Sequence, residues 1–190
     1  MHCLNLIAGC AGVALLISTS AAFAQVPPDP NNPNEAVPSQ VSVVPYGAPI
    51  NLATAKKVAD AAATEVNDRN WNAAFCITIV GPSGELVYFE KLDNCQYASI
   101  AISQHKAQVA ARYRRPTVVF ERLLAKGANF AYLTSLDNVI ASRGGNPLIA
   151  DGKIIGAIGV SGGTGSQDDT ISQAATKALG STTTGSATVK

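Results

Sequence analysis

An Asp-Gly pair at positions 151 and 152 stands between two apolar stretches, and this pair predicts a tight β-hairpin. Leu148-Ile149 leads into the pair, and residues 153–160 continue from it as a strand. Gly156 and Gly159 interrupt that strand, which indicates a bend or the close approach of another group. Because so short a connection joins antiparallel strands, the fold must be built around at least one antiparallel pair.

A second hairpin is predicted earlier in the chain. Residues 75–80 form an apolar run suited to a strand, and residues 86–89 form another. Between them lies Gly81-Pro82-Ser83-Gly84, a sequence rich in residues that favour turns. The two hairpins together supply four strands.

Two long helices are indicated before and after this second hairpin. Apolar side chains recur at helical spacing over residues 52–66, and Asn51 is placed to cap that helix. Residues 97–115 predict a second helix with a surface of alanines, and Pro116 ends it because proline cannot continue the hydrogen-bond ladder.

Two further helices complete the predicted order of elements. A short helix is expected over residues 117–124, capped by Thr117, and a final helix is expected from Ser166, where Ser166 and Asp169 match a capping box. Helices and strands in this order favour the α+β class, with an antiparallel sheet flanked by helices.

The two ends of the chain differ from its middle. Residues 4–18 are apolar and uncharged, and Ala22-Phe23-Ala24 fits the small-x-small pattern at which signal peptides are cleaved. We expect residues 1–24 to be a signal peptide, residues 25–49 a Pro-rich linker, residues 50–180 one domain, and residues 181–190 a disordered tail. The alternative for the first segment is a membrane anchor, although the apolar run is short for a bilayer span.

Cleavage would give an exported protein, periplasmic or extracellular, with no integral membrane segment. The whole chain is 47% hydrophobic and 14% charged with a net charge of +1, which favours a globular domain over a disordered chain or a nucleic-acid-binding protein. The mature chain would keep one histidine, His105, and two cysteines, Cys76 and Cys95. So few ligands argue against a zinc or copper site, and the chain has no G-x-S-x-G motif of a serine hydrolase.

Four ordered motifs carry a resemblance to a known family. They are Leu52-Ala53-x-Ala55, Val80-Gly81-x-x-Gly84, Ser103-x-x-Lys106-Ala107-x-x-Ala110, and the long string from Gly144-Gly145-x-Pro147-Leu148 through Asp151-Gly152 to Gly162-Gly163-Thr164. Over roughly residues 51–179 the chain resembles the GlcG/HbpS family of haem-binding-protein-like domains. The resemblance implies a profilin-like fold and a homo-oligomer. Some members of the family bind haem and some are secreted haem or redox sensors, whereas others occur beside glycolate-use or cobalamin-related genes.

Basic residues gather on the second long helix and just after it. Residues 106–126 contain six basic side chains and one acid, Glu121, so this stretch carries +5 in a chain of net +1. It is either a solvated helical face or an edge that binds carboxylates, such as haem propionates or a small organic acid. The candidates that we single out for haem or carboxylate binding are Lys106, Arg112, Tyr113 and Arg115.

His105 lies beside Lys106 and could be a haem-iron ligand, although it could equally be a surface or packing residue. Tyr97, Tyr113 and Tyr132 are alternative oxygen ligands. The leading hypothesis is an exported haem-binding or haem/redox-sensing protein. The alternative is an enzyme acting on a small hydroxy- or keto-acid or related carboxylate, with His105 or Lys106 as the general acid or base, so whether the chain is an enzyme stays open. A third interpretation is an interaction module without a ligand.

The two remaining cysteines are expected to pair. Export would place them in an oxidising compartment, and a loop near Asp93-Asn94 could bring Cys95 back to Cys76. The alternative is a buried free Cys76 and a surface Cys95. A disulfide closing a loop of this size would stabilise the fold by about 3 kcal/mol. Self-association is expected through the alanine-lined helix and the glycine-broken strand at 154–160.

Overall fold

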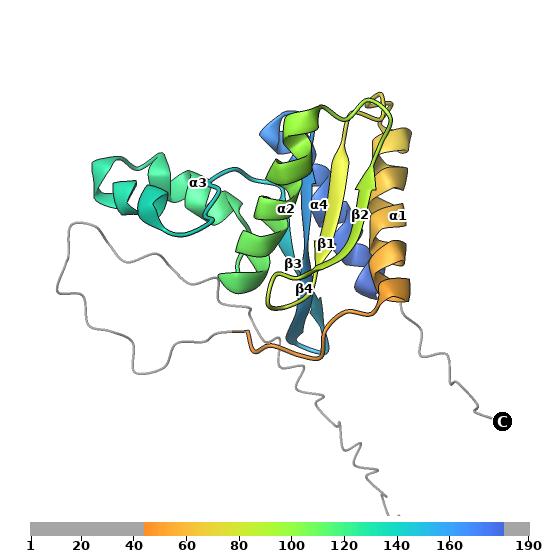
Figure 1. The fold of residues 1–190 in the computed structure, drawn as a ribbon, viewed down its shortest axis with the longest axis horizontal. Coiled ribbons are helices and arrows are strands. Elements are labelled where there is room, and N and C mark those ends of the chain that lie inside the picture. Colours follow the sequence, from red (N-terminus) through yellow and green to blue (C-terminus); the bar gives the residue numbers. More distant parts are fainter. Residues whose placement is uncertain (1–43, 181–190) are drawn as a thin grey trace, which may run out of the picture.

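The computed structural model describes residues 44–180, so the predicted signal peptide, most of the predicted linker and the predicted tail lie outside the described residues. A four-stranded antiparallel sheet forms its centre, with strand order β2-β1-β4-β3 (Figure 1). The strands are β1 (Cys76–Val80), β2 (Leu86–Lys91), β3 (Gly145–Ala150) and β4 (Lys153–Ser161). Both predicted hairpins and the α+β class are therefore confirmed.

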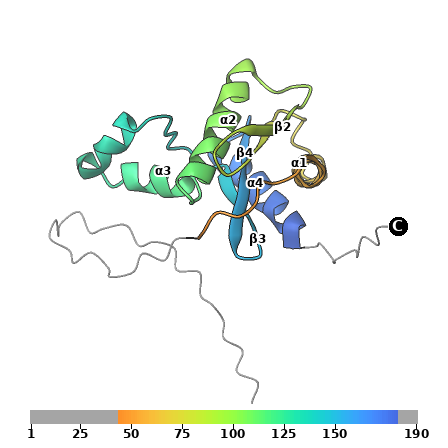
Figure 2. The ribbon, with the colours of Figure 1, turned by 60° about the horizontal axis from the view of Figure 1, so that its bottom comes forward.

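Three long helices cover the two faces of the sheet (Figures 1 and 2). They are α1 (Leu52–Asp68), α2 (Tyr97–Arg112) and α4 (Gly165–Gly180). Helices α1 and α4 lie together on one face, and α2 lies on the other. The main core lies beneath α1 and α4, where strand residues such as Ile77 and Ile158 meet helix residues such as Val58. Each of these three side chains is fully buried, and such burial stabilises a fold by about 1.5–3 kcal/mol per side chain.

The turn between β3 and β4 adopts the conformation that its sequence predicts. Asp151 has φ of 49° and Gly152 has φ of 70°, so both central residues occupy the left-handed region that a two-residue hairpin requires. Aspartate tolerates this region better than most residues, and glycine does so without steric cost.

Helix ends agree with the sequence at one position and differ at three. The Asn51 side chain accepts a hydrogen bond from Thr54 N at 2.8 Å, which confirms the predicted cap. Helix α2 ends at Arg112 instead of residue 115, because Arg114 turns into the left-handed region at φ of 54°. The Thr117 side chain makes no capping bond to α3, because its hydroxyl oxygen accepts from Gly145 N at 2.9 Å.

The cap of the last helix differs as well. Helix α4 begins at Gly165, so the predicted cap residue Ser166 already lies inside its first turn. Thr164 and Gln167 make the reciprocal bonds instead: Gln167 Oε1 accepts from Thr164 N at 2.9 Å, and Thr164 Oγ1 accepts from Gln167 N at 3.3 Å. A threonine–glutamine pair three residues apart satisfies the same exposed N–H groups as the predicted pair.

An arm projects from the domain between α2 and β3, to the left in Figure 1. It contains α3 (Val118–Leu124) and a 3₁₀ segment, η1 (Ala128–Ser135). Its own small core joins it to Val109 of α2, and that core consists of Phe120, Leu123, Phe130 and Leu133. An ion pair closes the base of the arm, where the Arg143 guanidinium and backbone N–H both donate to the Glu121 carboxylate.

Replacing Glu121 with glutamine should weaken the contact with Arg143, and the loss of stability should depend on pH. Hydrogen bonding from Arg143 lowers the pKa of the Glu121 carboxyl below its ordinary value. The Glu121–Arg143 ion pair therefore stabilises the fold at a pH above the unfolded-state pKa of about 4.3. This stabilisation is lost as the pH falls through the lower pKa of the folded state. Urea unfolding should show the E121Q variant slightly less stable than the parent at pH 7, with the gap closing below pH of about 4. A gap that widens in acid would contradict this assignment.

Residues 45–50, the end of the predicted linker, lie against β4. Gly47 N donates to Ile154 O at 2.8 Å, Ile154 N donates to Pro45 O at 2.8 Å, and Ile50 N donates to Ile155 O at 2.7 Å. The segment thus takes the place beside β4 that β1 leaves open. Within residues 44–180, no helix is both long and apolar enough to span a bilayer.

Candidate functional site

Helix α2 carries most of the predicted site residues, and glycines on the sheet hold it close. A Cβ atom at Gly159 would overlap Ser103 O and would lie 2.5 Å from Ala107 N. A Cβ at Gly145 would overlap Lys106 O in the same way. The helix backbone therefore rests directly on β3 and β4, and this explains the glycine predicted to allow a close approach at position 159.

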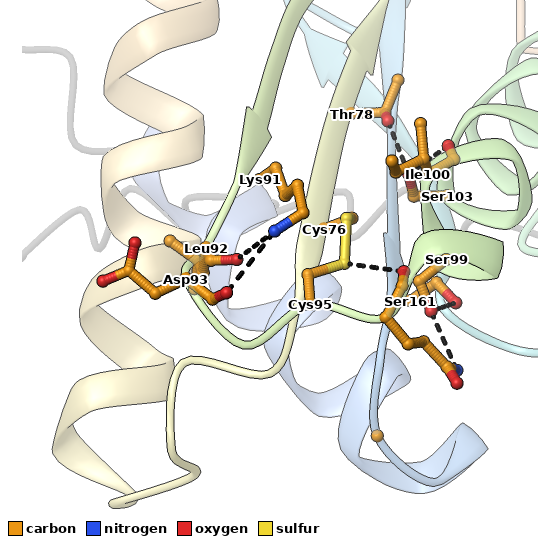
Figure 3. Close-up of a disulfide and its surroundings, with 12 residues drawn as sticks. Cys76, Thr78, Lys91, Leu92, Asp93, Cys95, Ser99, Ile100, Ser103 and Ser161 are labelled. Atoms are coloured by element: carbon orange, nitrogen blue, oxygen red, sulfur yellow. Dashed lines mark hydrogen bonds between the residues drawn. A yellow bond between two sulfur atoms is a disulfide. The ribbon is translucent and has the colours of Figure 1, made fainter.

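Buried hydroxyls set the rotation of α2 on the sheet. Ser103 Oγ and Thr78 Oγ1 are 2.8 Å apart, and the Ser161 hydroxyl donates to Ser99 Oγ at 3.1 Å (Figure 3). All four residues are buried, so each hydroxyl would lose free energy if its partner were removed. This row fixes which side of α2 faces the sheet and which faces outward.

A disulfide between Cys76 and Cys95 fixes the start of the helix. It links the first residue of β1 to a residue just before α2, and the two Cα atoms are 5.8 Å apart (Figure 3). This confirms the predicted pairing and excludes the alternative of two free thiols. Both cysteines are buried, so the bond lies inside the fold.

Lys106 is buried in an ion pair and lies away from the basic surface on which the sequence analysis placed it. Its Nζ donates to Asp168 Oδ2 at 2.6 Å and to Val160 O at 3.1 Å, and its side chain is 1% exposed. Asp168 Oδ1 accepts from Gly163 N at 3.0 Å. The pair joins α2 to the start of α4 and leaves Lys106 out of reach of a surface ligand or substrate.

Burial raises the pKa of the Asp168 carboxyl above its ordinary value. The Lys106 ammonium and the backbone N–H groups of Gly162 and Gly163 act in the opposite direction, with the smaller effect. Lys106 and these N–H groups thus offset part of the cost of burying the carboxylate.

His105 lies on the opposite, outward side of α2. Its side chain is exposed, and within residues 44–180 it forms no hydrogen bond or ion pair, so both ring nitrogens can reach a ligand. Residues three or four apart share one side of a helix, so Ala101 and Ala98 lie on the same side as His105. Both alanines are exposed, and Tyr97 nearby is 87% exposed.

Tyr113 and Arg115 turn toward the arm. The Tyr113 ring meets the Phe120 ring edge-on with centroids 5.3 Å apart. Arg115 Nε donates to Tyr113 O at 3.0 Å, and its guanidinium lies 5.9 Å from the Phe120 ring centroid. The structure therefore separates the five predicted ligand-binding residues into three places and leaves His105 and Arg112 on the exposed side of α2.

Arg112 has a partner that the sequence analysis missed. Its Nε donates to Ser83 O at 2.9 Å, and the Tyr46 hydroxyl lies 3.0 Å from Arg112 O. Tyr46 stands in the Pro-rich segment 66 residues away, and no motif links it to α2. No group of three or more histidine, cysteine or acidic side chains able to hold a metal ion occurs in the described part of the chain.

Comparison with protein families now identifies the fold. The family described as "haem degrading protein HbpS-like" matches residues 50–177. The chain belongs to the HbpS-like family. This confirms the predicted GlcG/HbpS membership, and the matched range contains the sheet, α1, α2, the arm and α4 as far as residue 177.

Relatives and solved structures agree with this membership. The chain is 34% identical over 130 residues to an uncharacterized 15.0 kDa protein from the dhaT-dhaS intergenic region of Citrobacter freundii. The aligned region covers 67% of this chain and 90% of that protein. It is 35% identical over 97 residues to protein GlcG of Escherichia coli strain K12, covering 51% of this chain and 69% of GlcG.

Among solved structures, Klebsiella pneumoniae protein ORFY superposes with a TM-score of 0.67 at 27% identity, covering 78% of this chain and 99% of ORFY. A PduOC–haem complex superposes with a TM-score of 0.63 at 22% identity, covering 70% of this chain and 96% of that protein. At 22% identity, the similarity to PduOC shows a shared fold and nothing more. The HbpS-like fold is thus the profilin-like α+β arrangement expected from the sequence.

Proposed function

We propose that this HbpS-like protein is an exported haem-binding protein and that His105 ligates the iron. The observation that carries the proposal is the exposed imidazole of His105, which has no partner within residues 44–180. Family membership supports it, and so does the likeness of the fold to PduOC, which was solved with haem. Haem would supply an iron centre for ligand binding or redox chemistry.

The outward side of α2 fits a flat, largely apolar group. Ala98 and Ala101 precede His105 by about two turns and one turn, and their small side chains would let a porphyrin lie close to the helix. A neutral imidazole is a common haem-iron ligand. Tyr97, at the start of the helix, adds an exposed aromatic ring with which the edge of a porphyrin could pack.

The propionate partner that we propose on α2 is Arg112. Arg112 follows His105 by seven residues, or about 10 Å along the helix axis, and is the one predicted basic candidate that remains exposed on α2. Its Nε is occupied by Ser83 O, so a propionate would have to meet the remaining nitrogens of the guanidinium. Lys106 cannot serve, because its ammonium is enclosed by Asp168 and Val160 O.

Export and self-association are part of the same proposal. The buried disulfide supports export, since structural disulfides persist in oxidising compartments. A porphyrin on one exposed helix face would leave its other side in water, so a second copy of the chain is the natural cover for it. The exposed residues Tyr97, Ala98 and Ala101 could then belong to a homo-oligomer interface, which light scattering of the haem-loaded protein would measure.

Titration of haemin into the purified protein should give a saturable shift of the Soret band. Replacing His105 with alanine should weaken binding by about tenfold or more and change the Soret and visible bands, because an iron ligand is lost.

Gln104, the neighbouring polar residue on α2, gives the matched control, and the Q104A variant should keep the parent spectrum. Unchanged bands and affinity in a folded H105A variant would reject His105 as the ligand. A folded parent protein without any saturable shift would reject haem binding altogether.

A further inference from the structure

A pocket of ≈ 380 Å³ lies at the C-terminal end of α2, and His105 is not among the residues that line it. It is lined by Tyr46, Pro82, Ser83 and Arg112. Three segments meet there: the stretch before α1, the β1–β2 turn, and the last turn of α2, all at the lower end of the sheet in Figure 1. Its volume is at the small end of the range for ligand sites.

The pocket holds the guanidinium of Arg112 in one place. Arg112 Nε donates to Ser83 O at 2.9 Å, which ties the side chain to the turn. Gly84, with φ of 90°, makes room for it, since a Cβ at this position would lie 2.6 Å from Arg112 Nε. The other nitrogens of this guanidinium form no hydrogen bond within residues 44–180.

The Tyr46 hydroxyl lies against the last carbonyls of α2, which could otherwise attract the Arg112 guanidinium in place of a ligand. Its hydroxyl lies 3.0 Å from both Ala111 O and Arg112 O, the carbonyls that would otherwise attract a cation at a helix C-terminus. A second guanidinium, that of Arg114, stacks over the Tyr46 ring with its Cζ 4.1 Å from the centroid. Tyr46 therefore contacts both arginines, Arg112 through its backbone carbonyl and Arg114 through its guanidinium.

Neither arginine has an acidic partner in the described part of the chain, where the ion pairs are Arg69–Glu65, Lys106–Asp168 and Arg143–Glu121. Glu85 is the nearest acid along the turn, but its carboxylate accepts hydrogen bonds from the backbone N–H and hydroxyl of Ser83. The Ser83 hydroxyl lowers the pKa of the Glu85 carboxyl, so this acid is satisfied within the turn. The guanidinium groups of Arg112 and Arg114 could therefore pair with an anion from solution.

We propose that this pocket binds the carboxylate of a small organic acid with an apolar or aromatic body. A guanidinium held by one nitrogen can present the others to a planar carboxylate as a pair of parallel donors. Tyr46 and Pro82 supply apolar walls for the rest of the molecule. The proposal does not rest on haem binding, although a haem propionate that reached Arg112 would use the same free nitrogens of its guanidinium.

The test uses the full chain without haem and benzoate as the probe, with binding followed by chemical-shift titration or calorimetry. Benzoate should bind saturably, and benzamide, which has the same shape without the charge, should bind at least about tenfold more weakly. The R112Q variant should weaken benzoate binding by about tenfold or more. The matched control is R122Q, an exposed arginine of the same basic stretch outside the pocket, which should bind within about twofold of the parent.

Circular dichroism and thermal melting check that each variant is folded. If R112Q does not fold, R112K decides the question, because lysine keeps the charge but lacks the planar pair of donors and should still lose several-fold in affinity. Three results would overturn the proposal: no saturable benzoate binding by the parent, equal binding of benzamide and benzoate, or unchanged benzoate affinity in a folded Arg112 variant.

Discussion

Replacing Lys106 with methionine should lower the free energy of unfolding at pH 7 by about 3–5 kcal/mol. Lys106 and Asp168 are both buried, with Nζ and Oδ2 2.6 Å apart. Methionine matches the volume of the lysine stem but leaves the Asp168 carboxylate without its cation in the interior. The Val160 carbonyl also loses a donor. Urea unfolding followed by circular dichroism measures the difference.

Two further variants separate the charge from the packing. In the double variant K106M/D168N the buried charge is gone, and the asparagine oxygen can still accept from Gly163 N, so about half or more of the lost stability should return. Lys57, exposed on α1, is the matched control, and K57M should change stability by less than about 0.5 kcal/mol. A double variant as unstable as K106M would show that lost packing, and not the uncompensated carboxylate, is responsible.

The pH dependence of K106M follows from the direction of the Asp168 shift. Burial already raises the pKa of this carboxyl, and losing the lysine removes a group that lowers it. A carboxyl group whose pKa is higher in the folded protein favours folding most at a pH below its unfolded-state pKa of about 3.9. That contribution is lost as the pH rises through its folded-state pKa. The gap between parent and K106M should therefore shrink as the solution is acidified.

Removing the disulfide should cost about 3 kcal/mol of stability. Cys76 and Cys95 are 19 residues apart, so the bond closes a loop of moderate length and restricts the unfolded chain. The C76A/C95A variant and the parent protein kept reduced should lose similar amounts in urea unfolding. Because both cysteines are buried, the alanine variant should lose slightly more through packing.

The reduced parent is the informative control, since it keeps both sulfur atoms in place and lacks only the cross-link. If reduction leaves the unfolding midpoint unchanged while C76A/C95A is destabilised, the bond contributes packing alone and the loop argument is wrong. Two thiols that react with alkylating agent in denatured protein, without any reductant, would show that the bond does not form in solution.

The sequence predicted those parts of the fold that local chemistry decides. Asp151 and Gly152 are themselves residues that favour the left-handed conformation of their turn, and the Asn51 cap depends on a backbone group three residues away. The end of α2 was less predictable, because Pro116 excludes only a continued helix and does not say how many residues earlier the helix stops. Arg114 in the left-handed region sets that point, and an arginine gives no sequence signal for it.

The site was harder to predict because its residues meet through distant contacts. Lys106 looked like part of a basic surface, and its burial depends on Asp168, which lies 62 residues further along the chain. Tyr46 stood in a Pro-rich stretch and reaches α2 only because residues 45–50 lie along β4. The pairing of Cys76 with Cys95 could be predicted from the sequence, because the hairpin between them brings Lys91 opposite Cys76 and so places the following residues near Cys76.

The backbone contact of α2 with β3 and β4 has a consequence for how the family can diversify. No side chain, not even a methyl group, fits between the helix and the strands at Gly145 or Gly159, so these two positions are closed to mutation unless the helix moves outward. Natural variants and designed libraries should tolerate no other residue there. The outward positions of α2, such as Tyr97, Ala101 and His105, are exposed, so substitutions there change the surface that the helix presents without moving the helix on the sheet. Evolution can therefore rewrite what this helix recognises without disturbing how it is seated.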